Sequence, residues 1–139
     1  MQATITEAAQ FVFEQLGPGH TESVYQNALK LELELSYDME VVAELPVNVL
    51  FRPSSSCANP VNSLWDQRIV GQAYVDLMVR SRTTGESTIL ELKSIQSIGS
   101  NEVAQLAKYV RLLSSVSSAM IVNFPKAGCD NKIKILRLV

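Results

Sequence analysis

Two stretches in the middle of the chain carry the apolar, partly alternating pattern of β-strands. Residues 69–80 and 87–95 are rich in valine, isoleucine and leucine, and the polar segment 81–86 separates them. Gly85 in that segment can adopt the left-handed backbone that a short hairpin loop needs. The pattern therefore predicts two antiparallel strands joined by a turn.

Helical and strand periods predict the other elements. Thr4 to Glu7 resembles a capping box that opens a first helix, and Pro46 indicates that its strand lies at a sheet edge or carries a bulge. The order of elements predicts an α/β fold with a mixed sheet and a crossover helix. In chain order, the expected helices are 4–16, 21–36 and 100–115, and the expected strands are 40–51, 69–80, 87–95, 119–124 and 132–139.

Each expected helix has one apolar stripe that we predict to face the core. Tyr25 lies beside the second stripe and suits either the core edge or a functional site. Gln105 and Tyr109, spaced i and i+4, lie off the third stripe, so they are available to a site or form a solvated flank. The three stripes are Ile5, Ala8, Val12 and Leu16; Val24, Ala28, Leu31 and Leu35; and Val103, Leu106, Val110 and Leu113.

The hairpin predicts which polar side chains meet. If the turn centres near Thr84, residues whose numbers sum to about 167 to 169 face each other, so Asp76 lies opposite the segment from Glu91 to Lys93. Because side chains alternate along a strand, Glu91 and Lys93 share one face. The register therefore places two carboxylates and a lysine together.

This set of side chains suits a divalent metal and phosphodiester hydrolysis. Mg²⁺ prefers carboxylate oxygens and keeps waters, one of which becomes a nucleophile when its pKa falls. Asp76 and Glu91 would hold the ion, and Lys93 would orient or deprotonate the water or stabilise charge on the phosphate. The alternative is that these residues form an ordinary solvated polar face.

A second motif lies near the N-terminus. Gly19, Glu22 and Tyr25 follow a Gly-Pro-Gly break, and the latter two share a helix face at spacing i and i+3. The pattern Gly-x-x-Glu-x-x-Tyr resembles the signature of the GxxExxY proteins, which belong to the PD-(D/E)xK nuclease-like superfamily. The resemblance covers nearly the whole chain, because the remaining motifs follow in the family's order.

The resemblance implies a restriction-endonuclease-like core, a central mixed β-sheet flanked by helices, and a nuclease active site that uses Mg²⁺ or Mn²⁺. It implies no particular substrate. Glu22, Asp76 and Glu91 match the metal-binding carboxylates, Lys93 matches the catalytic lysine, and Gln105 and Tyr109 match the polar residues of the next helix.

The segment from about residue 52 to 66 departs from the family pattern, in which the link is short. Long irregular loops are often functional, so Trp65 either docks this insertion on the body or on a partner, or merely pins a surface loop. Cys57 and Cys129 suit free thiols, or a disulfide between two loops. His20 suits a phosphate contact, proton transfer or an exposed turn.

Composition indicates a single domain over residues 1–139, since 47% hydrophobic content can form one core. We expect an intracellular location, in the cytoplasm, an organelle or the nucleus, and no membrane association. The formal charge of −2 argues against a simple DNA-binding protein.

Two functions stay open: a metal-dependent nuclease acting on DNA or RNA, and a non-catalytic subunit of a larger nucleoprotein assembly. A homodimer is a further expectation.

Overall fold

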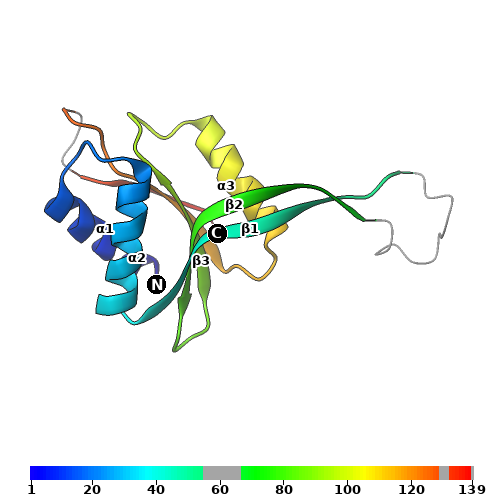
Figure 1. Ribbon diagram of the computed structural model, residues 1–139, viewed down its shortest axis with the longest axis horizontal. Helices are drawn as coiled ribbons and strands as arrows, with labels where there is room; N and C mark the ends of the chain where they lie inside the picture. Colours follow the sequence, from blue (N-terminus) through cyan, green and yellow to red (C-terminus); the bar gives the residue numbers. More distant parts are fainter. Residues whose placement is uncertain (55–66, 129–131, 139) are drawn as a thin grey trace.

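A computed structural model describes residues 1–54, 67–128 and 132–138, which form three helices and a five-stranded sheet (Figure 1). The expected order of elements and the α/β class are confirmed. The helices are α1 (Gln2–Leu16), α2 (Glu22–Ser36) and α3 (Ser100–Leu112), and the strands are β1 (Met39–Phe51), β2 (Arg68–Ser81), β3 (Ser87–Lys93), β4 (Ser118–Asn123) and β5 (Lys134–Leu138).

The sheet is mixed and has the strand order β1-β2-β3-β4-β5. β3 and β4 are parallel neighbours joined through α3, whereas the other neighbouring strands are antiparallel. β1 is an edge strand, as Pro46 predicted. Segments 55–66 and 129–131 and Val139 lie outside the described residues, so the expectations for Cys57, Trp65 and Cys129 cannot be placed.

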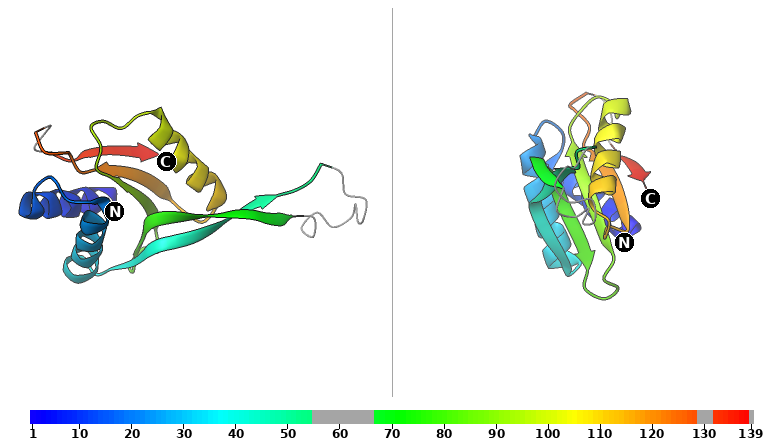
Figure 2. Two further views of the ribbon diagram at one scale, coloured as in Figure 1. Left: turned by 45° about the horizontal axis from the view of Figure 1, so that its top comes forward. Right: turned by 90° about the vertical axis from the view of Figure 1, so that its right-hand side faces the viewer.

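The helices cover the two faces of the sheet, with α1 and α2 on one side and α3 on the other (Figures 1 and 2). One hydrophobic cluster joins α1 and α2 to the sheet and includes Tyr25 and Phe124. A second cluster joins α3 to the opposite face through Leu106 and Tyr109.

The hairpin register agrees with the sequence prediction. Leu77 pairs with Leu90 and Arg80 with Ser87, so the paired numbers sum to 167. Gly85 has φ +77°, and its N–H donates to the Ser81 carbonyl at 3.0 Å. The turn residue thus has the left-handed conformation that was expected of it.

Two helix predictions are wrong in detail. α1 begins at Gln2 rather than at Thr4, because the Ile5 N–H already donates to the Met1 carbonyl at 3.0 Å. In α2 most of the predicted stripe is exposed, with Leu31 at 57% and Leu35 at 80%, although Ala28 packs against the first cluster. The neighbouring stripe, which contains Tyr25, Leu29 and Leu33, is fully buried instead because it faces the sheet.

At one position along the hairpin, the side chains of β1 and β2 change from one hydrophobic cluster to the other. Ala43 packs in the first cluster and Leu45 in the second, and Glu44 between them has φ +52°. On β2 the same change occurs between Leu77 and Val75, on either side of Asp76. The hairpin therefore leaves the main sheet at the position of the predicted catalytic aspartate.

Candidate metal centre

Asp76 and Glu91 lie together where β2 separates from β3. The last paired residues are Leu77 and Leu90, so these two carboxylates stand one step beyond the ladder. Oδ2 of Asp76 accepts a hydrogen bond from the Leu92 N–H at 2.7 Å. The aspartate side chain thereby takes the place of a strand carbonyl, which fixes it against the segment that the sequence predicted.

Glu91 is buried among apolar strands. It is 3% exposed, and its neighbours across the parallel pairing are the fully buried residues of β4, including Ile121. Its Oε1 atom is buried and accepts no hydrogen bond from the described residues. A buried carboxylate oxygen without a donor is costly, since it has lost its water.

Burial and mutual repulsion disfavour the charged forms of both acids. Burial, and then the negative charge of Asp76, raise the pKa of Glu91 to about 8. Burial also raises the pKa of Asp76, although the hydrogen bond from Leu92 opposes this shift. A divalent cation between the two carboxylates would stabilise both ionised forms, so the donor set and the orphaned oxygen fit such an ion.

Lys93 lies at the end of β3, two residues after Glu91. Its position is fixed by pairing with Asn123 and by the Phe124 N–H, which donates to the Lys93 carbonyl at 2.8 Å. The lysine charge lowers the pKa of both acids, which places it within electrostatic range of them. Asp76, Glu91 and Lys93 are therefore brought together.

Glu22 reaches the same end of the sheet from α2. Its Oε2 accepts a hydrogen bond from the Ser94 N–H, directly after β3, at 3.1 Å. Its charge raises the pKa of Asp76 and of Glu91, although less than their other neighbours do. Within the described residues, however, no three His, Cys, Asp or Glu side chains form a metal-binding group. Glu22 thus lies beside the pair, and its role as a third metal ligand stays a prediction.

Tyr25 proves to be a core residue that supports the loop before α2. Its ring is fully buried and stacks on Phe124 with centroids 4.3 Å apart. Its hydroxyl donates to the Gly17 carbonyl at 2.7 Å, and the ring of His20 meets it edge-on. The tyrosine of the Gly-x-x-Glu-x-x-Tyr motif therefore positions the loop that precedes Glu22.

Gln105 and Tyr109 bond to each other on α3. The amide of Gln105 donates to the Tyr109 hydroxyl at 3.3 Å, and the ammonium of Lys108 lies 5.1 Å from the centre of the tyrosine ring. Tyr109 is 4% exposed and belongs to the second cluster with Ile89. Tyr109 is therefore not part of a solvated flank, and its catalytic role stays a prediction.

Two polar residues near the centre were missed in the sequence. Glu44 lies at the level of Asp76 across the β1–β2 ladder, and its charge raises the aspartate pKa. Gln26, which is 8% exposed, donates from Nε2 to Oε1 of Glu44 at 3.0 Å. Nothing in the alternating strand pattern distinguishes Glu44 from a solvent-facing residue, because its φ of +52° is visible only in the structure.

Asn123 is a further polar residue near the centre that the sequence did not predict, because it belongs to a strand that is otherwise apolar and buried. It is 1% exposed, and its amide forms two 2.9 Å hydrogen bonds with the backbone of Ile95, one as donor and one as acceptor. These bonds tie β4 to the chain that follows Lys93. They hold the lysine end of β3 in place.

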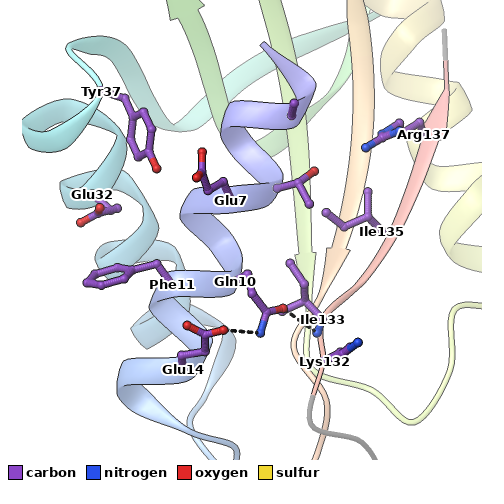
Figure 3. Close-up of a pocket in the computed structure, with 12 residues that line it drawn as sticks. Glu7, Gln10, Phe11, Glu14, Glu32, Tyr37, Lys132, Ile133, Ile135 and Arg137 are labelled. Carbon is purple, nitrogen blue, oxygen red and sulfur yellow. Dashed lines mark hydrogen bonds between the residues drawn. The ribbon is translucent and has the colours of Figure 1, made fainter.

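Two hollows differ in their relation to this centre. One of about 490 Å³ adjoins it and is lined by residues that include His20, Glu22, Ser94 and Lys126. Another, of about 740 Å³, lies between α1 and β5, and Figure 3 shows Phe11, Ile133 and several charged side chains around it. No predicted site residue lines the second hollow.

Comparison with known proteins gives the family. The model of the PD-(D/E)XK nuclease superfamily matches residues 1–136, so the chain belongs to this superfamily. Its members generally use divalent metal ions. The further assignment to the GxxExxY proteins stays a prediction.

Among solved structures, the chain is similar to one described as "Crystal structure of SSO0001", with a TM-score of 0.56 and 15% sequence identity. The similarity covers 83% of this chain and 48% of that chain, so this chain spans about half of that structure's length. At this identity the similarity concerns the fold alone. No curated protein matches. Within the described residues, no helix has the length and apolar character needed to span a membrane.

Proposed function

We propose that this protein is a metal-dependent nuclease that hydrolyses phosphodiester bonds in DNA or RNA with Mg²⁺ or Mn²⁺. The observation that carries the proposal is the pair of half-buried Asp76 and buried Glu91, whose raised pKa values and orphaned Glu91 oxygen call for a cation. Membership of the nuclease superfamily supports it.

Asp76 and Glu91 would hold the ion, with Glu22 as the third carboxylate. When bound, the ion lowers the pKa of a water and polarises a phosphoryl oxygen. Lys93 orients the attacking water and donates hydrogen bonds to the phosphate oxygens, whose negative charge grows as the phosphorus–oxygen bond to the leaving group breaks. Gln105 and Tyr109 support the centre from α3.

The test is a cleavage assay on labelled single- and double-stranded DNA and RNA in Mg²⁺, Mn²⁺ or EDTA. Glu91→Gln and Lys93→Ala should each lower cleavage at least about a hundredfold, because each removes a group that binds the ion or stabilises developing charge. Glu86→Gln, in the exposed hairpin turn, and Lys132→Ala, beside β5, are matched controls that should cleave normally.

One observation favours the second function, a non-catalytic nuclease-like subunit of a larger nucleoprotein assembly: the described carboxylates form no ready-made three-ligand group. If the wild type cleaves none of the substrates with either metal, or if the two site variants cleave as well as their controls, the nuclease proposal fails. The subunit function, as a homodimer or with other partners, would then replace it.

A further inference from the structure

The outer part of the β1–β2 hairpin is a two-stranded ribbon, which we call the arm and define as residues 45–54 and 67–74. β1 and β2 stay paired out to Phe51 and Arg68, whereas β3 pairs with β2 only over Leu77–Arg80. Figures 1 and 2 show the ribbon extending well beyond the other strands. The outer arm therefore lacks a third strand among the described residues.

Among the described residues, several apolar side chains of this ribbon are exposed. Two-stranded hairpins are marginally stable alone, and contiguous exposed apolar residues mark interaction surfaces. Five large side chains of the arm are between 49% and 64% exposed: Leu50, Phe51, Ile69, Val70 and Tyr74.

The charge of the arm identifies the kind of partner. Its described residues include two arginines, Arg52 and Arg68, and no acidic residue, whereas all fourteen acidic residues of the chain lie outside the arm. The arm thus complements a polyanion, although the chain as a whole carries a formal charge of −2. The arm of a second copy would bring the same positive charges.

One side of the arm also carries exposed hydrogen-bonding groups. The Gln72 amide donates to Oδ1 of Asn48 at 3.3 Å, and the Tyr74 hydroxyl donates to Oε1 of Gln72 at 2.8 Å. Among the described residues the Asn48 amide donates no hydrogen bond, so its donors are available to another molecule. Amide groups of this kind pair with base edges, and the major groove of B-DNA, about 12 Å wide, admits a two-stranded β-ribbon.

The arm leads directly to the candidate metal centre. Its last residue on β2, Tyr74, is followed by Val75 and then by Asp76, which contacts Leu92 and repels Glu91. A polyanion held along the ribbon would have its backbone guided toward the two carboxylates.

We propose that the arm holds duplex DNA, with the ribbon in the major groove and Arg52 and Arg68 at the phosphates. The inference rests on the proposed function, because it names the substrate of that centre and the surface that binds it. A-form RNA duplexes have a deep, narrow major groove that does not admit the ribbon, so duplex RNA should bind more weakly.

The experiment measures binding separately from cleavage. Fluorescence anisotropy in EDTA would follow binding of a labelled DNA duplex, an RNA duplex and single strands of the same sequence. The arm variant combines Arg52→Ala and Arg68→Ala. The control variant combines Arg80→Ala, at the other end of β2, and Arg137→Ala, on the opposite edge strand, so that the charge change is equal.

The wild type and the control should bind duplex DNA more tightly than the other probes. The arm variant should bind it about tenfold more weakly at low salt, and the slope of log K against log salt should shrink by about two, since two phosphate contacts are lost. Circular dichroism would establish that both variants are folded.

Equal DNA binding by the arm variant and the control would overturn the inference, as would tighter binding of single strands or of duplex RNA. Concentration-dependent dimerisation that is lost in Phe51→Ser, without DNA binding, would overturn it in favour of self-association. Arm-dependent DNA binding without cleavage would support the arm while refuting the nuclease. Cleavage by the wild type, together with unchanged DNA affinity in the arm variant, would support the nuclease while refuting the arm.

Discussion

Strands β1 and β2 run through both the arm and the rest of the molecule, which we call the body, but their side chains are buried to very different extents in the two regions. On β2, Val75 is fully buried in the second cluster, whereas Val70, five residues earlier, is 61% exposed. The strands have similar apolar composition in both regions. The difference comes from β3 and the helices, which cover the hairpin in the body and not at the end of the arm. Burial of the hairpin is thus decided by the elements that cover it, and the candidate metal centre lies where the pairing with β3 ends.

The largest expected effect concerns the buried acid of the body. Folded Glu91 keeps its proton up to about pH 8, whereas the unfolded residue loses it near pH 4.5. Between these values the unfolded state binds fewer protons, so the stability of the metal-free protein should fall as pH rises, by on the order of a few kcal/mol. Urea unfolding in EDTA at pH 5, 6.5 and 8 would measure this.

Glu91→Gln removes the titrating group and should flatten that part of the profile, whereas Glu86→Gln in the exposed turn should leave it unchanged. Mg²⁺ at pH 8 should restore stability to the wild type and not to Glu91→Gln, because a ligand that binds only the folded state stabilises it. Parallel profiles for the wild type and Glu91→Gln would contradict the assignment of a raised pKa.

A smaller effect compares one substitution in the two regions. Val75→Ala removes two buried methyl groups and should lower the free energy of unfolding by about 2 kcal/mol. Val70→Ala makes the same chemical change on the arm, where it should cost less than about 0.5 kcal/mol. Chemical denaturation of the two variants would measure the difference. Equal losses would show that the arm is packed in solution.

The smallest effect compares two tyrosine hydroxyls. Tyr25→Phe loses the 2.7 Å hydrogen bond to the Gly17 carbonyl in the body and should cost about 1 kcal/mol. Tyr74→Phe loses the exposed bond to Gln72, which water replaces, so thermal melting should barely change. If Tyr74→Phe proved the more costly, the polar row on the arm would contribute to folding rather than to binding.

Local patterns predicted the elements and the hairpin register well, because alternation and the turn glycine act between neighbouring residues. They failed where two patterns competed. In α2 the stripes containing Leu31 and Leu33 are both apolar, and only the sheet selects the stripe that is buried. The sheet contacts involve residues far away in sequence, which helical period cannot rank.

The candidate site shows the same limit. The sequence alone predicted that Asp76 lies opposite Glu91, because the two residues belong to strands joined by one short turn. The approach of Glu22 to Ser94 joins positions far apart in the chain, and only the family resemblance anticipated it. Glu44 was not predicted as a site residue, because the residue pattern does not indicate its left-handed backbone conformation.

The hydrogen bond from the Leu92 N–H to Asp76 bears on how an inactive form of this protein should be made. Asp76→Ala would leave that buried backbone donor without an acceptor, and the junction of arm and body would rearrange together with any loss of metal binding. Asp76→Asn keeps a carbonyl oxygen for the same N–H while removing the charge. A trapped complex with an uncleaved duplex is therefore best sought with the asparagine variant, in which the geometry of the strand junction survives.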